Sequence, residues 1–132
     1  MFEALVVALF GLILGSFANV LILREETGET IMGRSHCPHC ERSLEWYELF
    51  PVLSFIALRG KCRTCAARIS WQYPSIEALT AGAFVVIALA PTTLALKLIG
   101  VPIILLLICI SVFDLRTMYI PDRWAYSFAG LA

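Results

Sequence analysis

Charged residues are scarce in this sequence of 132 amino acids. They make up 15% of the chain, and ten basic residues balance ten acidic ones. Soluble domains contain about 25% charged residues, whereas here 60% of residues are hydrophobic and the mean hydropathy is +0.84. This composition excludes an ordinary soluble domain and predicts a protein whose main solvent is the lipid bilayer. The lack of net positive charge also argues against a nucleic-acid-binding surface.

The first long uncharged run extends from Ala4 to Leu23. Its twenty residues would form a helix about 30 Å long, enough to cross the hydrocarbon core. No basic residue precedes the run, and Glu3 has the wrong charge for the flank of a secretory signal peptide. We therefore expect a retained transmembrane helix.

Small residues recur on one face of this helix, at Gly11, Gly15 and Ala18. This spacing is typical of helix contacts in membranes, so we expect the face to pack against another helix. Asn19 lies beside it, and two interpretations stay open: a hydrogen bond within the packing, or the lining of a polar cavity.

Four of the five cysteines form two C-x-x-C pairs. The pairs are Cys37-Pro38-His39-Cys40 and Cys62-Arg63-Thr64-Cys65. Two such pairs can complete a closed shell of four thiolates around one tetrahedral ion, so the spacing predicts a zinc site at Cys37, Cys40, Cys62 and Cys65. Disulfides and plain buried thiols are the alternatives. With four thiolates present, we expect His36 and His39 to support the ligands or to face solvent.

Residues 24–73 form a long polar segment, with seven Lys or Arg residues against six Glu. The positive-inside rule counts the basic residues and predicts a cytoplasmic loop. Reducing conditions there disfavour disulfides and leave thiolates for metal. The apolar and aromatic run 44–55 has two interpretations that are compatible with each other, a small core around the metal and a belt at the membrane surface. Gly60 permits positive φ in a turn before the second pair.

Residues 78–113 contain a single charge, Lys97, and are long enough for two membrane spans. We predict a helical hairpin with its turn at residues 90–93 and with Lys97 reaching to the interface. Glu77, at the entry of the second span, is either interfacial or functional. Cys109 lies deep in the third span, where we expect it to pack as a small apolar residue.

The third span is expected to end at Phe113, just before Asp114. A carboxylate at the membrane boundary is a candidate acid or base. Asp122 follows Pro121 and is expected to cap or begin a fourth helix. Along one helix the two aspartates would lie about 12 Å apart, so we do not expect them to pair. The closing apolar run is too short to span, and the chain is expected to be truncated.

The predicted fold is therefore an all-α polytopic membrane protein, with three transmembrane helices, the start of a fourth, and a small cytoplasmic zinc-binding loop between the first and second spans. The expected parts are the first helix (1–23), the zinc loop (24–73), the helical hairpin (74–113) and the segment with Asp114 and the fourth helix (114–132).

Several motifs occur here in the order found in one family. They are Gly15 to Val20, the two C-x-x-C pairs, Trp46 to Ser54, Leu58 to Cys62, Tyr73 to Glu77 and Asp114 to Asp122. From residue 11 to 124 the sequence resembles the bacterial type IV prepilin peptidases.

This resemblance implies a membrane aspartic peptidase of the bacterial inner membrane. Such enzymes remove the leader peptides of prepilins and pseudopilins, and many also methylate the new N-terminus with S-adenosylmethionine. Asp114 matches the first catalytic aspartate, and the zinc loop belongs to the region associated with methylation. Gly60 and Glu77 are candidates for binding the methyl donor.

The sequence also departs from the family. The second catalytic aspartate lies in a Gly-x-Gly-Asp motif, which these residues do not contain, so the chain alone is expected to be proteolytically inactive. A non-enzymatic, membrane-anchored zinc module that docks a partner stays an alternative. A DNA-binding zinc ribbon is disfavoured by the near balance of charge in the loop.

Overall fold

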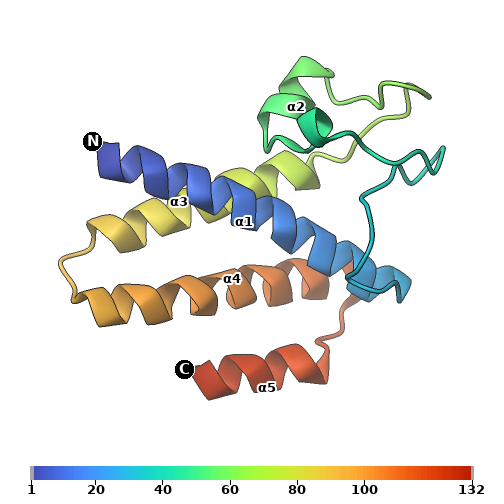
Figure 1. Ribbon diagram of the computed structural model, residues 1–132. Coiled ribbons are helices and arrows are strands. Elements are labelled where there is room, and N and C mark those ends of the chain that lie inside the picture. Colours follow the sequence, from blue (N-terminus) through green and yellow to red (C-terminus); the bar gives the residue numbers. More distant parts are fainter. Residues whose placement is uncertain (1, 132) are drawn as a thin grey trace.

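The computed structural model describes residues 2–131, and within that range it is helical with no strands (Figure 1). In chain order the elements are α1 (Phe2–Thr27), the 3-10 helix η1 (Trp46–Leu49), α2 (Leu53–Ala57), α3 (Gln72–Leu89), α4 (Leu94–Thr117) and α5 (Asp122–Leu131). The predicted all-α fold is confirmed.

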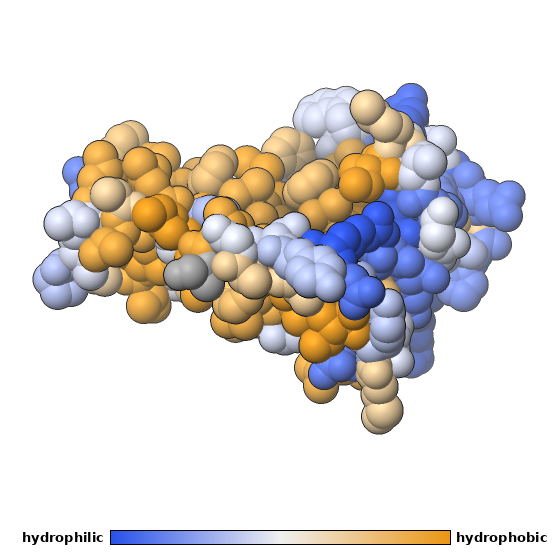
Figure 2. Space-filling view, turned by 90° about the horizontal axis from the view of Figure 1, so that it is seen from below, coloured by the Kyte–Doolittle hydropathy of each residue, from blue (hydrophilic) through white to orange (hydrophobic). Residues whose placement is uncertain are grey.

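Three of these helices, α1, α3 and α4, are long and apolar enough to cross a membrane. Hydrophobic side chains cover one part of the molecule and hydrophilic side chains gather at its other end (Figure 2). The three predicted spans are therefore confirmed. Two helices run further than expected: α1 continues past Leu23 to Thr27, and α4 continues past Phe113 to Thr117.

α3 and α4 form the predicted hairpin, with residues 90–93 between them. The Lys97 ammonium donates a hydrogen bond of 2.5 Å to the backbone oxygen of Ala88 in the last turn of α3. A cation at this position is favourable because the carbonyl end of a helix carries partial negative charge.

α1 packs closely on α3 through its small residues. A Cβ atom built on Gly11 would lie 2.6 Å from Ala81 Cα, and one on Gly15 would lie 2.7 Å from Glu77 Cα. Only glycine fits at these positions. The predicted contact face is therefore confirmed, and its partner is α3.

The apolar core lies where α1, α3 and α4 meet. Its buried members include Ile22, Ile76, Ile108, Cys109 and Phe113. Cys109 is 3% exposed, so the expectation that it packs as a small apolar side chain is confirmed.

Ion pairs join the polar ends of α1, α4 and α5. Arg116 lies 2.7 Å from Glu26, and Arg123 pairs with Glu25. These contacts bring the last turn of α4, which contains Asp114, to the same end of the bundle as the loop that follows α1 (Figure 1).

Candidate functional site

The two C-x-x-C pairs fold into closely similar turns. In the first, the Cys37 N–H donates to Arg42 O at 3.0 Å and the Glu41 N–H donates to Cys37 O at 2.9 Å. In the second, the equivalent bonds are Cys62 to Ala67 O at 2.8 Å and Ala66 to Cys62 O at 3.0 Å. Each turn is a knuckle that directs two thiols to one side.

Both knuckles also share their backbone conformation. Glu41 and Ala66, each directly after the second cysteine, have φ values of 55° and 56°. One antiparallel bridge closes each turn, between His36 and Ser43 and between Lys61 and Arg68. The same local fold is therefore used twice.

The structure brings together the four sulfurs that the sequence predicts as ligands. The Sγ atoms of Cys37, Cys40, Cys62 and Cys65 lie within 4.8 Å of one another. Cys37 Sγ and Cys65 Sγ are 3.8 Å apart. Zn–S bonds of about 2.3 Å in a tetrahedron place sulfurs about 3.8 Å apart. The donor set and spacing therefore fit a closed tetrahedral metal site.

The thiols influence one another's charge. Backbone N–H groups of Cys65 and Thr64 lower the pKa of the Cys62 thiol to about 6. The Ala67 N–H lowers the pKa of Cys65, but desolvation of the thiol and the neighbouring sulfurs outweigh it and raise that pKa to about 11. One thiolate is stabilised while a second is disfavoured beside it. A bound dication would remove this repulsion, because it favours the deprotonated form of every ligand.

The two histidines near the first knuckle are exposed, and neither belongs to the four-sulfur cluster. Neither alternative for the cysteines agrees with this geometry. All four are free thiols rather than disulfides, and their sulfurs converge on one point, whereas plain buried thiols would pack separately.

The aromatic segment between the knuckles is mostly exposed. Trp46 is 70% and Leu53 is 67% exposed, and Tyr47 and Phe50 are exposed as well. Leu44 and Phe55 of the same run are half-buried and line the cavity beside the knuckles. The run therefore combines exposed aromatic side chains, as expected of a belt at the membrane surface, with others that pack near the cysteines.

One acidic side chain of this segment is buried. Arg42 donates to the two carboxylate oxygens of Glu48 at 2.7 and 3.0 Å, and the Glu45 N–H also donates to Glu48 at 2.9 Å. The Arg42 guanidinium lowers the pKa of the Glu48 carboxyl. This pair joins the first knuckle to η1, and the sequence analysis did not single it out.

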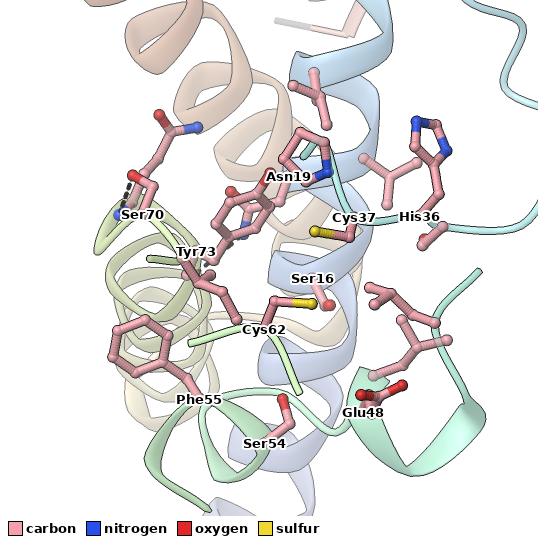
Figure 3. Close-up of a pocket in the computed structure, with 18 of the residues that line it drawn as sticks. Ser16, Asn19, His36, Cys37, Glu48, Ser54, Phe55, Cys62, Ser70 and Tyr73 are labelled. Atoms are coloured by element: carbon pink, nitrogen blue, oxygen red, sulfur yellow. Dashed lines mark hydrogen bonds between the residues drawn. The ribbon is translucent and has the colours of Figure 1, made fainter. Parts of the chain in front are cut away.

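A cavity of about 410 Å³ lies between the knuckles and the helices α1 and α3. Ser16 and Asn19 of α1, Tyr73 of α3, and Cys37 and Cys62 of the knuckles surround it (Figure 3). Its size is within the range of about 300–1,000 Å³ for small-molecule sites.

Asn19 fulfils both roles left open by the sequence. Its amide nitrogen donates to Gly15 O at 3.3 Å and to Tyr73 O at 3.1 Å, and its side chain lines the cavity. Glu77 also lines the cavity and is 6% exposed. Its carboxylate accepts a hydrogen bond of 2.7 Å from the Val52 N–H.

Gly60 has a φ of 66° and packs beside Phe55, but within the described chain it does not line the cavity. Of the two methyl-donor candidates, only Glu77 does so. Asp114 is exposed in the last turns of α4, where its backbone oxygen accepts from Met118. Asp122 lies in the first turn of α5.

Comparison with known proteins identifies the family. Residues 9–90 match the family model described as the bacterial peptidase A24 N-terminal domain. The chain belongs to this family. The matched range contains both knuckles, the cavity-lining part of α1 and all of α3, so the A24 N-terminal domain includes most of the site described above.

Curated relatives extend the A24 match beyond residue 90. The chain is 37% identical over 131 residues to an Escherichia coli protein named type 4 prepilin-like proteins leader peptide-processing enzyme. This match covers 85% of the present chain and 49% of the Escherichia coli protein. It is 42% identical over 117 residues to the prepilin leader peptidase/N-methyltransferase of Bacillus subtilis, and this match covers 87% of the present chain and 47% of the Bacillus protein. The chain spans about half the length of these relatives. No solved structure matches it.

Proposed function

We propose that this chain forms the N-terminal part of a membrane-embedded prepilin leader peptidase/N-methyltransferase. The observation that carries the proposal is the similarity to enzymes of that name over more than four-fifths of the chain. The substrates would be the leader peptides of type IV prepilins and pseudopilins. The setting would be the bacterial inner membrane, with the zinc loop and Asp114 on the cytoplasmic side.

In this proposal the four cysteines hold a structural zinc ion. Four thiolates leave no open coordination position for water or substrate. The knuckles lie far apart in the sequence. The bridge of each knuckle joins residues of that knuckle alone, so the ion would be the main connection between the two. Zinc would therefore fold residues 24–73 rather than take part in the reaction.

Asp114 would supply one carboxylate of an aspartic peptidase. Such a peptidase needs one carboxylate ionised to activate water and a second protonated to donate a hydrogen bond to the scissile carbonyl. The family resemblance gives the second role to an aspartate in a Gly-x-Gly-Asp motif, which these 132 residues do not contain. We therefore propose that cleavage requires that further motif.

The methyltransferase function would use S-adenosylmethionine, which supplies an electrophilic methyl group when bound. The cavity beside the knuckles has a suitable size, and it combines polar residues with apolar walls. Of the two candidate residues, Glu77 is the one that could contact the reacting groups, because it lines the cavity and Gly60 does not.

The test is leader cleavage by the complete gene product in membranes, comparing Asp114→Asn with Asp122→Asn. Asp114→Asn should abolish cleavage, because asparagine cannot take or hold the proton. Asp122→Asn should retain it, because asparagine also stabilises a helix start. Undiminished cleavage by Asp114→Asn would remove Asp114 from the mechanism.

A second candidate is a non-enzymatic zinc module that docks a partner. The exposed aromatic segment favours it, since Trp46 and Phe50 offer a large apolar surface. The same assay separates the two, because a docking module would cleave no leader in any version.

A further inference from the structure

Glu77 is a buried carboxylate without a counter-ion. It is 6% exposed, and no Lys or Arg in the described part of the chain forms an ion pair with it. Its protein partners are neutral donors, the Val52 N–H at 2.7 Å and the Ser16 hydroxyl. Buried carboxylates are costly unless they are paired, so this one has capacity for a cationic partner.

Asn19 provides a second free acceptor on the same cavity. It is 2% exposed, and its Oδ1 atom is buried with no hydrogen-bond partner among the described residues. The orientation of the amide is fixed, because exchanging its nitrogen and oxygen would turn the oxygen toward the carbonyls of Gly15 and Tyr73. An unsatisfied buried oxygen of this kind indicates a missing donor.

Three other charged groups of the lining already have partners, whereas Glu29 and Arg68 belong to its loop side. Arg24 donates to the backbone oxygens of Thr30 and Gly33, and Arg116 pairs with Glu26. Glu48 is held by Arg42. On the helix wall of the cavity, and among the described residues, Glu77 is a carboxylate without an ion pair and Asn19 supplies an amide oxygen without a donor.

We propose that Glu77 and Asn19 bind the α-ammonium group of the peptide that is to be methylated. This inference rests on the proposed methyltransferase function, and it assigns the amine site within it. A primary ammonium group carries several N–H donors and one positive charge. It would donate to the amide oxygen and also neutralise the carboxylate, whereas a neutral donor would supply no charge and an anion would be repelled.

This placement also gives Glu77 a task in the reaction. The carboxylate accepts a proton from the ammonium group and leaves a neutral amine with a free lone pair. The nitrogen then forms a bond to the methyl carbon of a sulfonium donor while the sulfur–carbon bond breaks, and the sulfur keeps that electron pair. Glu77 finally releases its proton to water.

The experiment uses the full-length enzyme and measures leader cleavage and N-methylation in the same samples. Glu77→Gln keeps the size of the side chain and its acceptor for the Val52 N–H. It should leave cleavage intact and slow methylation about ten- to a hundredfold, the value of a charge-assisted hydrogen bond. Glu3→Gln, an exposed carboxylate outside the cavity lining and the knuckles, should change neither. Methylation by Glu77→Gln at the wild-type rate would overturn the proposal.

A second measurement needs no variant, and it decides the matter if Glu77→Gln does not fold. Binding to the wild-type enzyme is compared for two synthetic peptides with a mature pilin N-terminus, one with a free α-amine and one N-acetylated. The free amine should bind about tenfold more tightly or better. Equal binding would refute the amine site. If the wild-type enzyme neither cleaves nor methylates, the proposed function fails, while the peptide comparison still tests the site.

Discussion

Replacing Gly15 with alanine tests the close contact on which the cavity depends. In the structure the added Cβ would lie 2.7 Å from Glu77 Cα and 3.1 Å from both Cβ and Oγ1 of Thr80. Carbon atoms are at their optimal separation at about 3.5–4.0 Å. The nearest obstacle is backbone, so α1 and α3 must move apart by the order of an ångström.

The size of the effect follows from packing costs. Forcing an extra carbon into a well-packed contact costs about 1–3 kcal/mol, a factor of roughly 5 to 150 in an equilibrium constant. Gly82 of α3 is the matched control, because a Cβ there meets no atom within 4 Å. Gly82→Ala should raise the free energy of unfolding by about 0.5–1 kcal/mol, because alanine has the better helix propensity.

The assay is denaturant unfolding of the purified full-length protein in detergent micelles, followed by the fluorescence of its tryptophans. Gly15→Ala should lower the free energy of unfolding, whereas Gly82→Ala should leave it unchanged or higher. Because the shift also displaces Glu77, Gly15→Ala should weaken binding of the free-amine peptide. Similar stabilities for the two variants would refute the packing argument.

Three further predictions concern the loop. Cys62→Ser should lower the zinc content well below one ion per chain, whereas Cys109→Ser should not, as measured by atomic absorption. Arg42 lowers the pKa of Glu48 from its ordinary value of 4.5. The stabilisation of the loop by this pair is therefore complete at pH values above 4.5, and it is lost as the pH falls through the lowered pKa. Glu48→Gln should therefore increase protease sensitivity at pH 7 and have no effect at the acidic limit. In spheroplasts treated with a chelator, the exposed Cys65 thiol should react only with reagents that enter the cytoplasm; labelling from outside would reverse the proposed orientation.

Hydropathy and spacing were sufficient to predict the main fold. Long uncharged runs have few alternatives in a bilayer, because every backbone polar group must be satisfied within a helix. The helix ends were less predictable. The uncharged run stops at Leu23, but the next residues include Arg24, Glu25 and Glu26, which are good helix formers, so the helix continues into the polar region.

The contacts between distant segments could not be read from the sequence. Arg116 meets Glu26 across ninety residues, and nothing near either residue specifies the other. The sequence did not decide whether Glu77 is interfacial or functional. Its burial depends on a long-range contact, in which the loop around Val52 folds back onto α3. The knuckles were easier to predict, since each pair of thiols is set by its own short turn.

The proposed metal site and the proposed amine site share a wall, and this leads to a final prediction. Cys37 and Cys62 belong to the four-sulfur cluster and also line the cavity opposite α1 and α3. A zinc ion that holds the two knuckles together would therefore fix the shape of the cavity without touching the substrate.

Removing zinc with a strong chelator should weaken binding of the free-amine peptide to the full-length enzyme and slow methylation. Cleavage should change less, because Asp114 lies on α4, which is held by ion pairs rather than by the knuckles. Readdition of zinc should restore both amine binding and methylation. If the chelated enzyme instead distinguishes free from acetylated peptide as well as the untreated enzyme does, the cavity keeps its shape without the metal and the proposed coupling is wrong.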